Sequence, residues 1–207
     1  MLNNIKITDI TKTKKGFNAL FADEEFLFSV DDVVLYRNNI QIGSCFTRQE
    51  LACISKQSQD AKAVDKAYTL LSSRMHSKKE LYDKLLRKFE PESARHAVDK
   101  MEELDLIDDS VFAQMKAEYL LNVKKQSISA VKLKLASLGI DKDIIDSVLL
   151  SFELDNQIDE ISSLLQSKYR SKLSSPEKVV ASLLRKGFKY GEIKQAFNNL
   201  NINLQEY

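Results

Sequence analysis

The sequence predicts a mainly α-helical protein, with three tandem three-helix repeats that form a curved, elongated solenoid behind a small β-rich N-terminal extension. The first observation is a shortage of turn residues, since the 207 residues include only five glycines and two prolines. Sandwiches, barrels and loop-rich folds need many more of them. The second observation is a helical period of apolar residues from residue 47 onward, and the third is that this pattern recurs along the chain.

The N-terminal segment has the pattern of strands. Apolar residues alternate over 17–21 and again over 26–30, on either side of a polar interruption at 22–25. This alternation predicts a β-hairpin with a four-residue turn. Isoleucines within 5–7 and 40–42 allow a third strand and one more short strand. Because an isolated hairpin is only marginally stable in water, we expect this segment to pack on the helical body or to bind a partner.

Capping residues indicate where the helices begin. Thr47 with Glu50, and Ser77 with Glu80, match the capping box that satisfies free N–H groups at a helix N-terminus. The other predicted caps and first-turn prolines are Pro91, Asp108, Asp109, Ser127, Asp141, Ser175 and Pro176. The helix that begins at Asp108 and Asp109 is predicted to bury one stripe of side chains, formed by Val111, Phe112, Met115 and Tyr119.

One helical pattern occurs three times. Leu85, Leu135 and Leu183 occupy equivalent positions that are 50 and 48 residues apart. Gly139 and Gly187 end the same helix of copies two and three, where a left-handed conformation is least strained for glycine. The predicted organisation is a β-rich extension at 1–46, a helical connector at 47–60, and repeats at 61–107, 108–155 and 156–207.

No catalytic, cofactor or metal site is evident. The sequence has no GxGxxG or GxxxxGK[ST] phosphate loop. His76 and His96 have no ligand at suitable spacing, and the acidic pair at 108–109 is interpreted as a helix cap. Cys45 and Cys53 are predicted to be free thiols. No apolar run approaches the ~18 residues of a membrane span, and no export signal is visible. We therefore expect a cytoplasmic protein that is not an enzyme and needs no cofactor or metal.

Positive charge gathers in the turns, although the net charge is only +1. The turn between the first and second helices is basic in every copy. Two interpretations stay open: cations are favoured near helix C-termini, or the turns form a stripe that binds a phosphate backbone. Tyr169 in the third basic turn is either a core residue or a side chain that stacks on a base. The candidate contacts are Arg74, Lys78, Lys79, Arg87, Lys88, Lys124, Lys125, Lys168, Arg170, Lys172, Arg185 and Lys186.

Three motifs within about residues 60–203 carry a family resemblance. They are Leu-Leu-Ser-Ser-Arg at 70–74 with Ser77, Glu80, Leu81, Lys84 and Leu85; Leu-Ile-Asp-Asp at 106–109 with Phe112 and Ala113; and Leu-Arg-Lys-Gly-Phe at 184–188 with Tyr190. In this order they resemble the RecX family of regulatory proteins. The family usually has a glycine before the phenylalanine that corresponds to Phe89, and its absence here predicts a shorter turn.

The resemblance implies a bacterial cytoplasmic protein that binds filaments of RecA recombinase on single-stranded DNA. It further implies inhibition of strand exchange, ATP hydrolysis and co-protease activity, in DNA repair, recombination and the SOS response. We expect a monomer that contacts DNA directly or through RecA and does not bind membranes. The alternative is a sequence-nonspecific nucleic-acid-binding protein that acts independently of RecA, because each three-helix unit also resembles a helix-turn-helix module.

Overall fold

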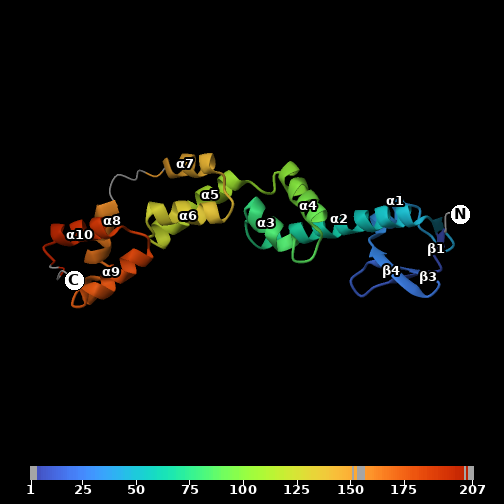
Figure 1. Ribbon diagram of the computed structural model, residues 1–207, viewed down its shortest axis with the longest axis horizontal. Helices are drawn as coiled ribbons and strands as arrows, with labels where there is room; N and C mark the ends of the chain where they lie inside the picture. The colour runs from blue at the N-terminus through green and yellow to red at the C-terminus, as the bar shows by residue number, and fades with distance from the viewer. Residues whose placement is uncertain (1–3, 151, 153–156, 203, 205–207) are drawn as a thin grey trace. The chain divides into compact units, whose positions relative to one another are not determined.

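The chain folds into two compact units, Met1–Ile107 and Asp108–Tyr207. A computed structural model describes residues 4–150, 152, 157–202 and 204 (Figure 1). The described residues confirm the predicted fold class, because they are mainly helical and their strands all lie in the N-terminal segment. None of the described helices is both long enough and apolar enough to cross a bilayer.

Two small antiparallel sheets form the N-terminal part of the first unit. Strands β2 (Asp9–Lys12), β3 (Asn18–Ala22) and β4 (Glu25–Val30) make one sheet, and β1 (Ile5–Lys6) pairs with β5 (Cys45–Phe46) in the other. The hairpin at 17–30 is therefore confirmed. The third strand of its sheet is β2 instead of residues 5–7.

Two details of the predicted strands are wrong. The hairpin turn has two residues instead of four, because Ala22 pairs with Glu25 while Asp23 and Glu24 take φ of 47° and 69°. Tight hairpin turns require positive φ at their central residues, and aspartate tolerates it better than most residues. Residues 40–42 form no strand, and Ile40 is buried in the core instead.

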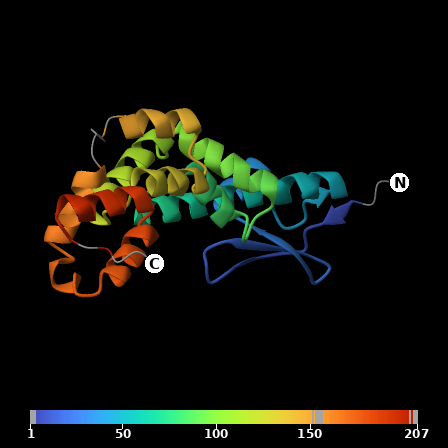
Figure 2. The same cartoon turned by 60° about the vertical axis from the view of Figure 1, so that its left-hand side comes forward.

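A long helix joins the sheets to the first repeat. Helix α2 (Arg48–Ser73) runs through both the connector and the first repeat helix. Its predicted capping box is present, with the Glu50 N–H donating to Thr47 Oγ1 at 3.2 Å and the Thr47 N–H donating to Glu50 Oε2 at 2.7 Å. A short helix, α1 (Asp32–Arg37), precedes it. The β2–β4 sheet lies against α2, where Ser58 Oγ donates to the Ser29 carbonyl at 2.7 Å (Figure 2).

The first repeat continues with α3 (Lys78–Leu85) and α4 (Pro91–Glu103). Ser77 caps α3 and proline occupies the first turn of α4, as predicted. The segment from Leu85 to Phe89 is one residue shorter than its equivalents in the other repeats, and the Phe89 N–H donates to the Leu85 carbonyl, four residues earlier. The corresponding bonds from Ile140 and Phe188 span five residues, and the glycines before them have φ of 81° and 89°.

The second unit contains the helices of the second and third repeats. Helix α5 (Asp109–Glu118) continues into a π-helix, η1 (Tyr119–Val123), and is followed by α6 (Ile128–Ser137) and α7 (Lys142–Leu150). The remaining elements are α8 (Gln157–Gln166), the 3₁₀-helix η2 (Arg170–Lys172), α9 (Pro176–Arg185) and α10 (Tyr190–Asn199). The predicted boundary at 155–156 lies outside the described residues.

Each set of helices in this unit encloses its own apolar cluster. Phe112, Val131, Leu135 and Ile145 belong to the first cluster, and residues such as Phe197 belong to the second. The sequence led us to expect one continuous core between neighbouring repeats, whereas the described buried residues form separate clusters. The two repeats are therefore joined by local contacts between helix ends.

The buried face of α5 differs from the predicted stripe. Phe112 is buried as expected, whereas Val111, Met115 and Tyr119 are 49%, 54% and 42% exposed. Ala113 and Ala117, together with Leu120, occupy the inner face instead. Alanines have short side chains that let α7 pack closely on α5, so packing selects this face over the more apolar one.

Candidate nucleic-acid interface

The second and third repeats meet where the N-terminus of α6 contacts the C-terminus of α9. Ser127 caps α6, because its Oγ accepts from the Ala130 N–H at 3.2 Å. The same hydroxyl donates to the Gly187 carbonyl at 2.7 Å, and the Ser127 N–H donates to the Lys186 carbonyl at 3.0 Å. Ser127 is 2% exposed, so these bonds are shielded from water. They hold the two repeats in one register.

Gly187 is required at this contact for two separate reasons. Its φ of 89° disfavours any residue with a side chain. A Cβ at this position would also lie 2.6 Å from Ala130 Cβ and 2.7 Å from Ser127 Oγ. The glycine predicted from sequence as a helix end therefore also allows the close approach of α6.

Four of the predicted cations come together at this contact. The Lys186 ammonium donates to the Lys124 carbonyl, and burial lowers the pKa of Lys186 below its ordinary value. The neighbouring ammonium groups of Lys168, Lys124 and Lys125 lower this pKa further. Glu160, whose carboxylate lies 3.2 Å from Lys125, opposes that effect. We call Lys124, Lys125, Lys168 and Lys186 the junction cluster; its like charges would be stabilised by a bound anion.

The backbone beneath the junction cluster is irregular. Two of its lysines directly follow the π-helix η1, and π-turns occur frequently at functional sites. Lys125 has φ of 52°, a left-handed conformation that costs a non-glycine residue roughly 1–2 kcal/mol. A lysine thus stands where glycine would be less strained, which suggests that its charge has a role.

An exposed tyrosine lies beside the junction cluster. The ring centroid of Tyr119 is 5.4 Å from the Lys124 ammonium and 5.9 Å from that of Lys116. Tyr169, considered above as a stacking residue, is only 4% exposed and its hydroxyl hydrogen-bonds Ser182 Oγ at 2.8 Å. Tyr169 is therefore a core residue, and Tyr119 is the aromatic side chain of this region that is available to a base.

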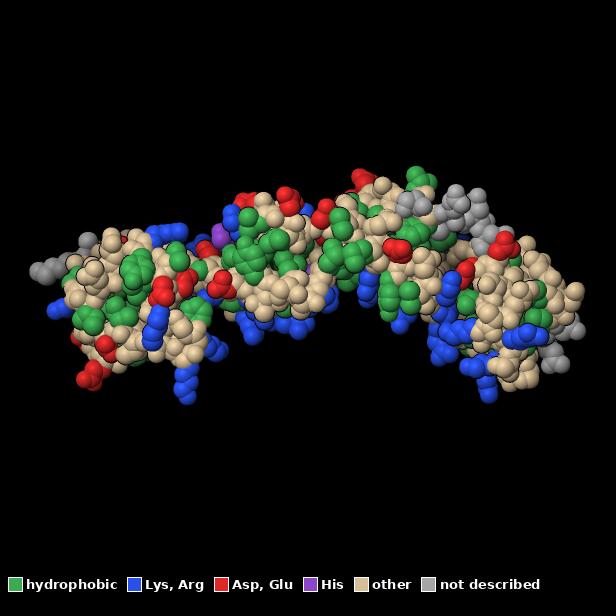
Figure 3. Space-filling view, turned by 180° about the vertical axis from the view of Figure 1, so that it is seen from behind, with side chains coloured by type: hydrophobic (Ala, Val, Ile, Leu, Met, Phe, Trp, Pro, Cys, Tyr) green, Lys and Arg blue, Asp and Glu red, His purple; other side chains and the backbone are tan. Residues whose placement is uncertain are grey.

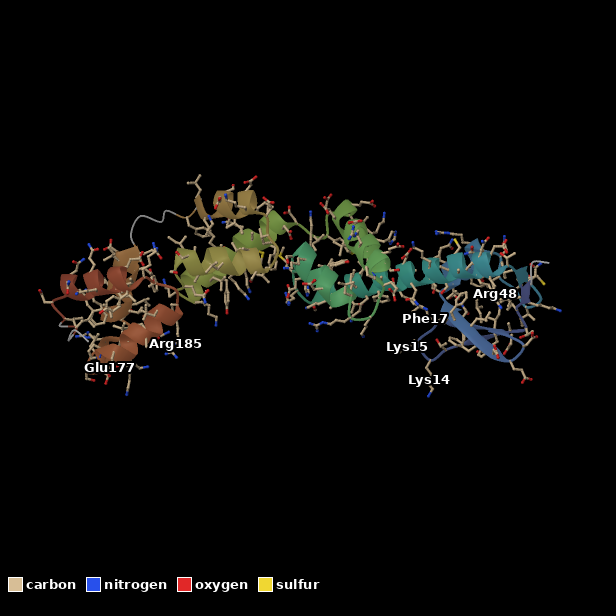
Figure 4. All side chains as sticks on the ribbon, in the orientation of Figure 1. Lys14, Lys15, Phe17, Arg48, Glu177 and Arg185 are labelled. Atoms are coloured by element: carbon tan, nitrogen blue, oxygen red, sulfur yellow. The ribbon has the colours of Figure 1, made fainter. Side chains whose placement is uncertain are left out.

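The other predicted cations of the second unit flank this region. Arg170 and Lys172 are exposed on η2, and Arg170 also lines a pocket of about 460 Å³ with Leu165 and Leu200. Arg185 lies at the C-terminal end of α9, and Glu177 lies at its opposite end (Figure 4). Lys and Arg side chains gather on one side of this unit where its two repeats meet (Figure 3).

Of the five predicted cations in the first unit, two are paired with carboxylates and three are exposed. Arg74 makes two hydrogen bonds to Glu80, of 2.9 Å and 2.5 Å, which lower the pKa of that carboxyl. Lys78 pairs with Glu102 at 2.5 Å. Lys79, Arg87 and Lys88 are exposed. A stripe through all three repeats would span both units and stays a prediction.

His76 is buried between these basic residues. Its Nδ1–H donates to the Arg74 carbonyl at 2.8 Å, and its Nε2 accepts from Lys84 Nζ at 2.7 Å. Burial lowers the pKa of His76, and the charges of Arg74 and Lys84 lower it further. The ring is therefore neutral and has a structural role. Among the described residues, no three His, Cys, Asp or Glu side chains are placed to hold a metal.

The chain is similar in sequence to known proteins. Residues 63–101 match the family model "RecX, first three-helix domain". "Regulatory protein RecX" of Clostridioides difficile is 26% identical over 208 residues, covering 97% of this chain and 98% of the relative. The protein of the same name from Streptococcus gordonii is 29% identical over 202 residues, covering 96% and 78%.

Two solved structures are also similar. A crystal structure of regulatory protein RecX has a TM-score of 0.65 at 24% identity, covering 92% of this chain and 99% of the other. That of RecX from Lactobacillus salivarius has a TM-score of 0.56 at 25% identity, covering 70% and 98%.

The described helices define a tandem helical-repeat protein, and lysines gather where its second and third repeats meet. Its relatives are named regulatory proteins. The chain is therefore similar to the regulatory proteins named RecX, in sequence over nearly its whole length and in fold.

Proposed function

We propose that this protein binds RecA filaments on single-stranded DNA and inhibits their recombinase, ATPase and co-protease activities. Its similarity to proteins named regulatory proteins supports a binding role, and the resemblance of its motifs to the RecX family implies RecA as the partner. In this proposal the protein acts in the cytoplasm as a monomer and is not an enzyme.

The junction cluster is the observation that carries the DNA side of the proposal. Four lysines share one contact region, and Glu160 is the carboxylate among the described residues that opposes their mutual repulsion. Closely spaced ammonium groups bind a phosphate backbone without reading its sequence. Tyr119 adds a stacking surface, which also tolerates any base.

The geometry favours DNA that is single-stranded. An aromatic ring stacks on a base only where that base is free of a duplex, and lysines around an aromatic ring are typical of single-strand binding surfaces. DNA inside a RecA filament offers phosphates and bases next to a protein surface. A protein with nearly balanced total charge and local basic clusters is electrostatically complementary to a partner that presents both DNA and protein surfaces.

A titration of RecA ATP hydrolysis tests this function. Increasing amounts of the protein are added to preformed filaments and, separately, to filaments that are assembling. We expect substoichiometric protein to lower DNA-dependent hydrolysis in at least one of these conditions. Unchanged hydrolysis at every ratio, with protein shown by circular dichroism to be folded, would contradict the proposal.

The same cluster supports a second function, in which the protein binds single-stranded nucleic acid directly and acts without RecA. The four lysines can bind phosphate groups in the absence of a protein partner. Binding of equal affinity to bare DNA and to RecA-coated DNA would favour this alternative.

A further inference from the structure

The turn between β2 and β3 in the first unit carries two lysines that the sequence analysis assigned to no site. Lys14 and Lys15 are exposed, and their side chains point away from the sheet (Figure 4). No ion pair engages either of them among the described residues. Two adjacent cations without counter-charges repel each other and favour an anionic ligand.

The backbone that presents these lysines is held by local hydrogen bonds. The Thr13 N–H donates to the Phe17 carbonyl at 2.8 Å, and the Phe17 N–H donates to Thr13 Oγ1 at 3.1 Å. The Gly16 N–H also donates to the Thr13 carbonyl at 3.0 Å, and Gly16 has the positive φ that this turn needs. The turn therefore has a defined shape without a ligand.

The base of the turn is fixed to helix α2. Lys62 of α2 places its ammonium 5.0 Å from the ring centroid of Phe17 and donates to the carbonyl and hydroxyl of Ser29. Burial lowers the pKa of Lys62, as expected for a cation that is packed inside the unit. Lys62 thus has a structural role, and the exposed charge lies in the turn itself.

The nearby carboxylates are already engaged. Asp31 caps α1 by accepting from the Val34 N–H at 2.6 Å. Asp32 accepts from Lys12 Nζ at 2.6 Å and from Asn18 Nδ2 at 2.8 Å, which lowers the pKa of Asp32. These bonds leave the two lysines of the turn as the surplus positive charge at this end of the sheet.

We propose that Lys14 and Lys15 form a second contact for the phosphodiester backbone of single-stranded nucleic acid. Residues 13–16 contain no apolar side chain, and Phe17 is half-buried beside Lys62, so the turn lacks the apolar centre of a protein–protein interface. Exposed ammonium groups on a rigid turn suit a row of phosphates. This contact needs no RecA, so it stands or falls separately from the proposed function.

Equilibrium binding of the full chain to fluorescent oligodeoxythymidylate and oligouridylate, at several salt concentrations and without RecA, tests this contact. The test variant is Lys14→Gln/Lys15→Gln. The control, Lys6→Gln/Arg37→Gln, removes the same charge from β1 and α1 of the same unit. Circular dichroism and thermal melting establish that both variants are folded.

We expect the turn variant to bind both probes more weakly and to lower the slope of log affinity against log salt by about 1.4, since each lost phosphate contact removes ~0.7. The control is expected to change the slope much less. Equal losses of affinity and of salt slope in both variants would show that only the net charge of the protein matters, and would overturn the proposal. Unchanged nucleic-acid binding in the turn variant would overturn it as well.

Discussion

Ser127 Oγ donates a 2.7 Å hydrogen bond to the carbonyl of Gly187, although the two residues are 60 positions apart in the chain. The serine begins a helix of the second repeat and the glycine ends a helix of the third. This bond brings together cations from both repeats. The helix boundaries that the sequence predicts separately are thus parts of one contact.

The first prediction concerns this contact. Gly187→Ala is expected to lower the free energy of unfolding by about 2 kcal/mol or more, because it combines a positive φ with overpacking against Ala130. Gly191→Ala is the matched control, since no atom lies within 4 Å of its added Cβ and its φ is not positive. Urea denaturation of both variants measures the difference. Equal stability of the two would show that the close approach is not needed.

The second prediction separates stability from binding at Lys125. Lys125→Gly relieves the φ of 52° and is expected to raise the free energy of unfolding by about 0.5–1 kcal/mol. It also removes a cation of the junction cluster, so affinity for single-stranded DNA should fall. Denaturation and fluorescence anisotropy on the same preparation measure both quantities. Unchanged or higher affinity for single-stranded DNA in the variant would contradict a binding role for the lysine.

The third prediction concerns Tyr119. Tyr119→Leu is expected to weaken binding to single-stranded DNA by ~1–3 kcal/mol, the range for one stacked base. Tyr119→Phe keeps the ring and should bind with nearly wild-type affinity. Because this side chain is 42% exposed, both variants should fold. If the leucine and phenylalanine variants bind equally well, stacking on Tyr119 does not occur.

The fourth prediction is a pH dependence at His76. The folded protein lowers the pKa of His76 below the value of 6.5, so the unfolded chain takes up this proton more readily. Stability is therefore expected to fall as the pH drops through 6.5, at a higher pH than the loss expected from Glu80, whose pKa is lowered from 4.5. Denaturation midpoints across this range should decline in the wild type and vary less in His76→Asn. Parallel profiles would assign the pH dependence to other groups.

Local sequence signals predicted the helix ends well. The caps at Thr47, Ser77, Asp108 and Ser127 were predictable because a short polar side chain satisfies N–H groups only two or three residues away. Turn lengths were less predictable. The sequence suggests four turn residues at 22–25, and the structure uses two, because pairing of the strands extends into the polar segment.

Features that depend on packing between distant residues were not predictable. Apolar residues occur on two faces of α5, and only the packed structure selects Phe112 over Met115 for burial. The sequence identified Lys124 and Lys186 as cations of separate repeats. The two residues are 62 positions apart, and they come into contact only when the second and third repeats pack together. No local sequence pattern indicates this packing. Lys14 lies outside the helical repeats, so the repeat pattern that marks the other cations does not include it.

The decisive measurement compares affinity for RecA-coated and bare single-stranded DNA. The junction variant is Lys124→Gln/Lys168→Gln, which alters the two exposed lysines of the cluster and leaves the Lys124 carbonyl in place. The control is Lys142→Gln/Lys178→Gln, which removes equal charge from exposed positions on α7 and α9. Sedimentation with filaments and anisotropy with bare DNA measure all three proteins at one salt concentration.

We expect the wild type and the control to bind the filament more tightly than bare DNA, and the junction variant to lose affinity for the filament. If all three proteins bind filament and bare DNA alike, the protein does not recognise RecA filaments through the junction cluster.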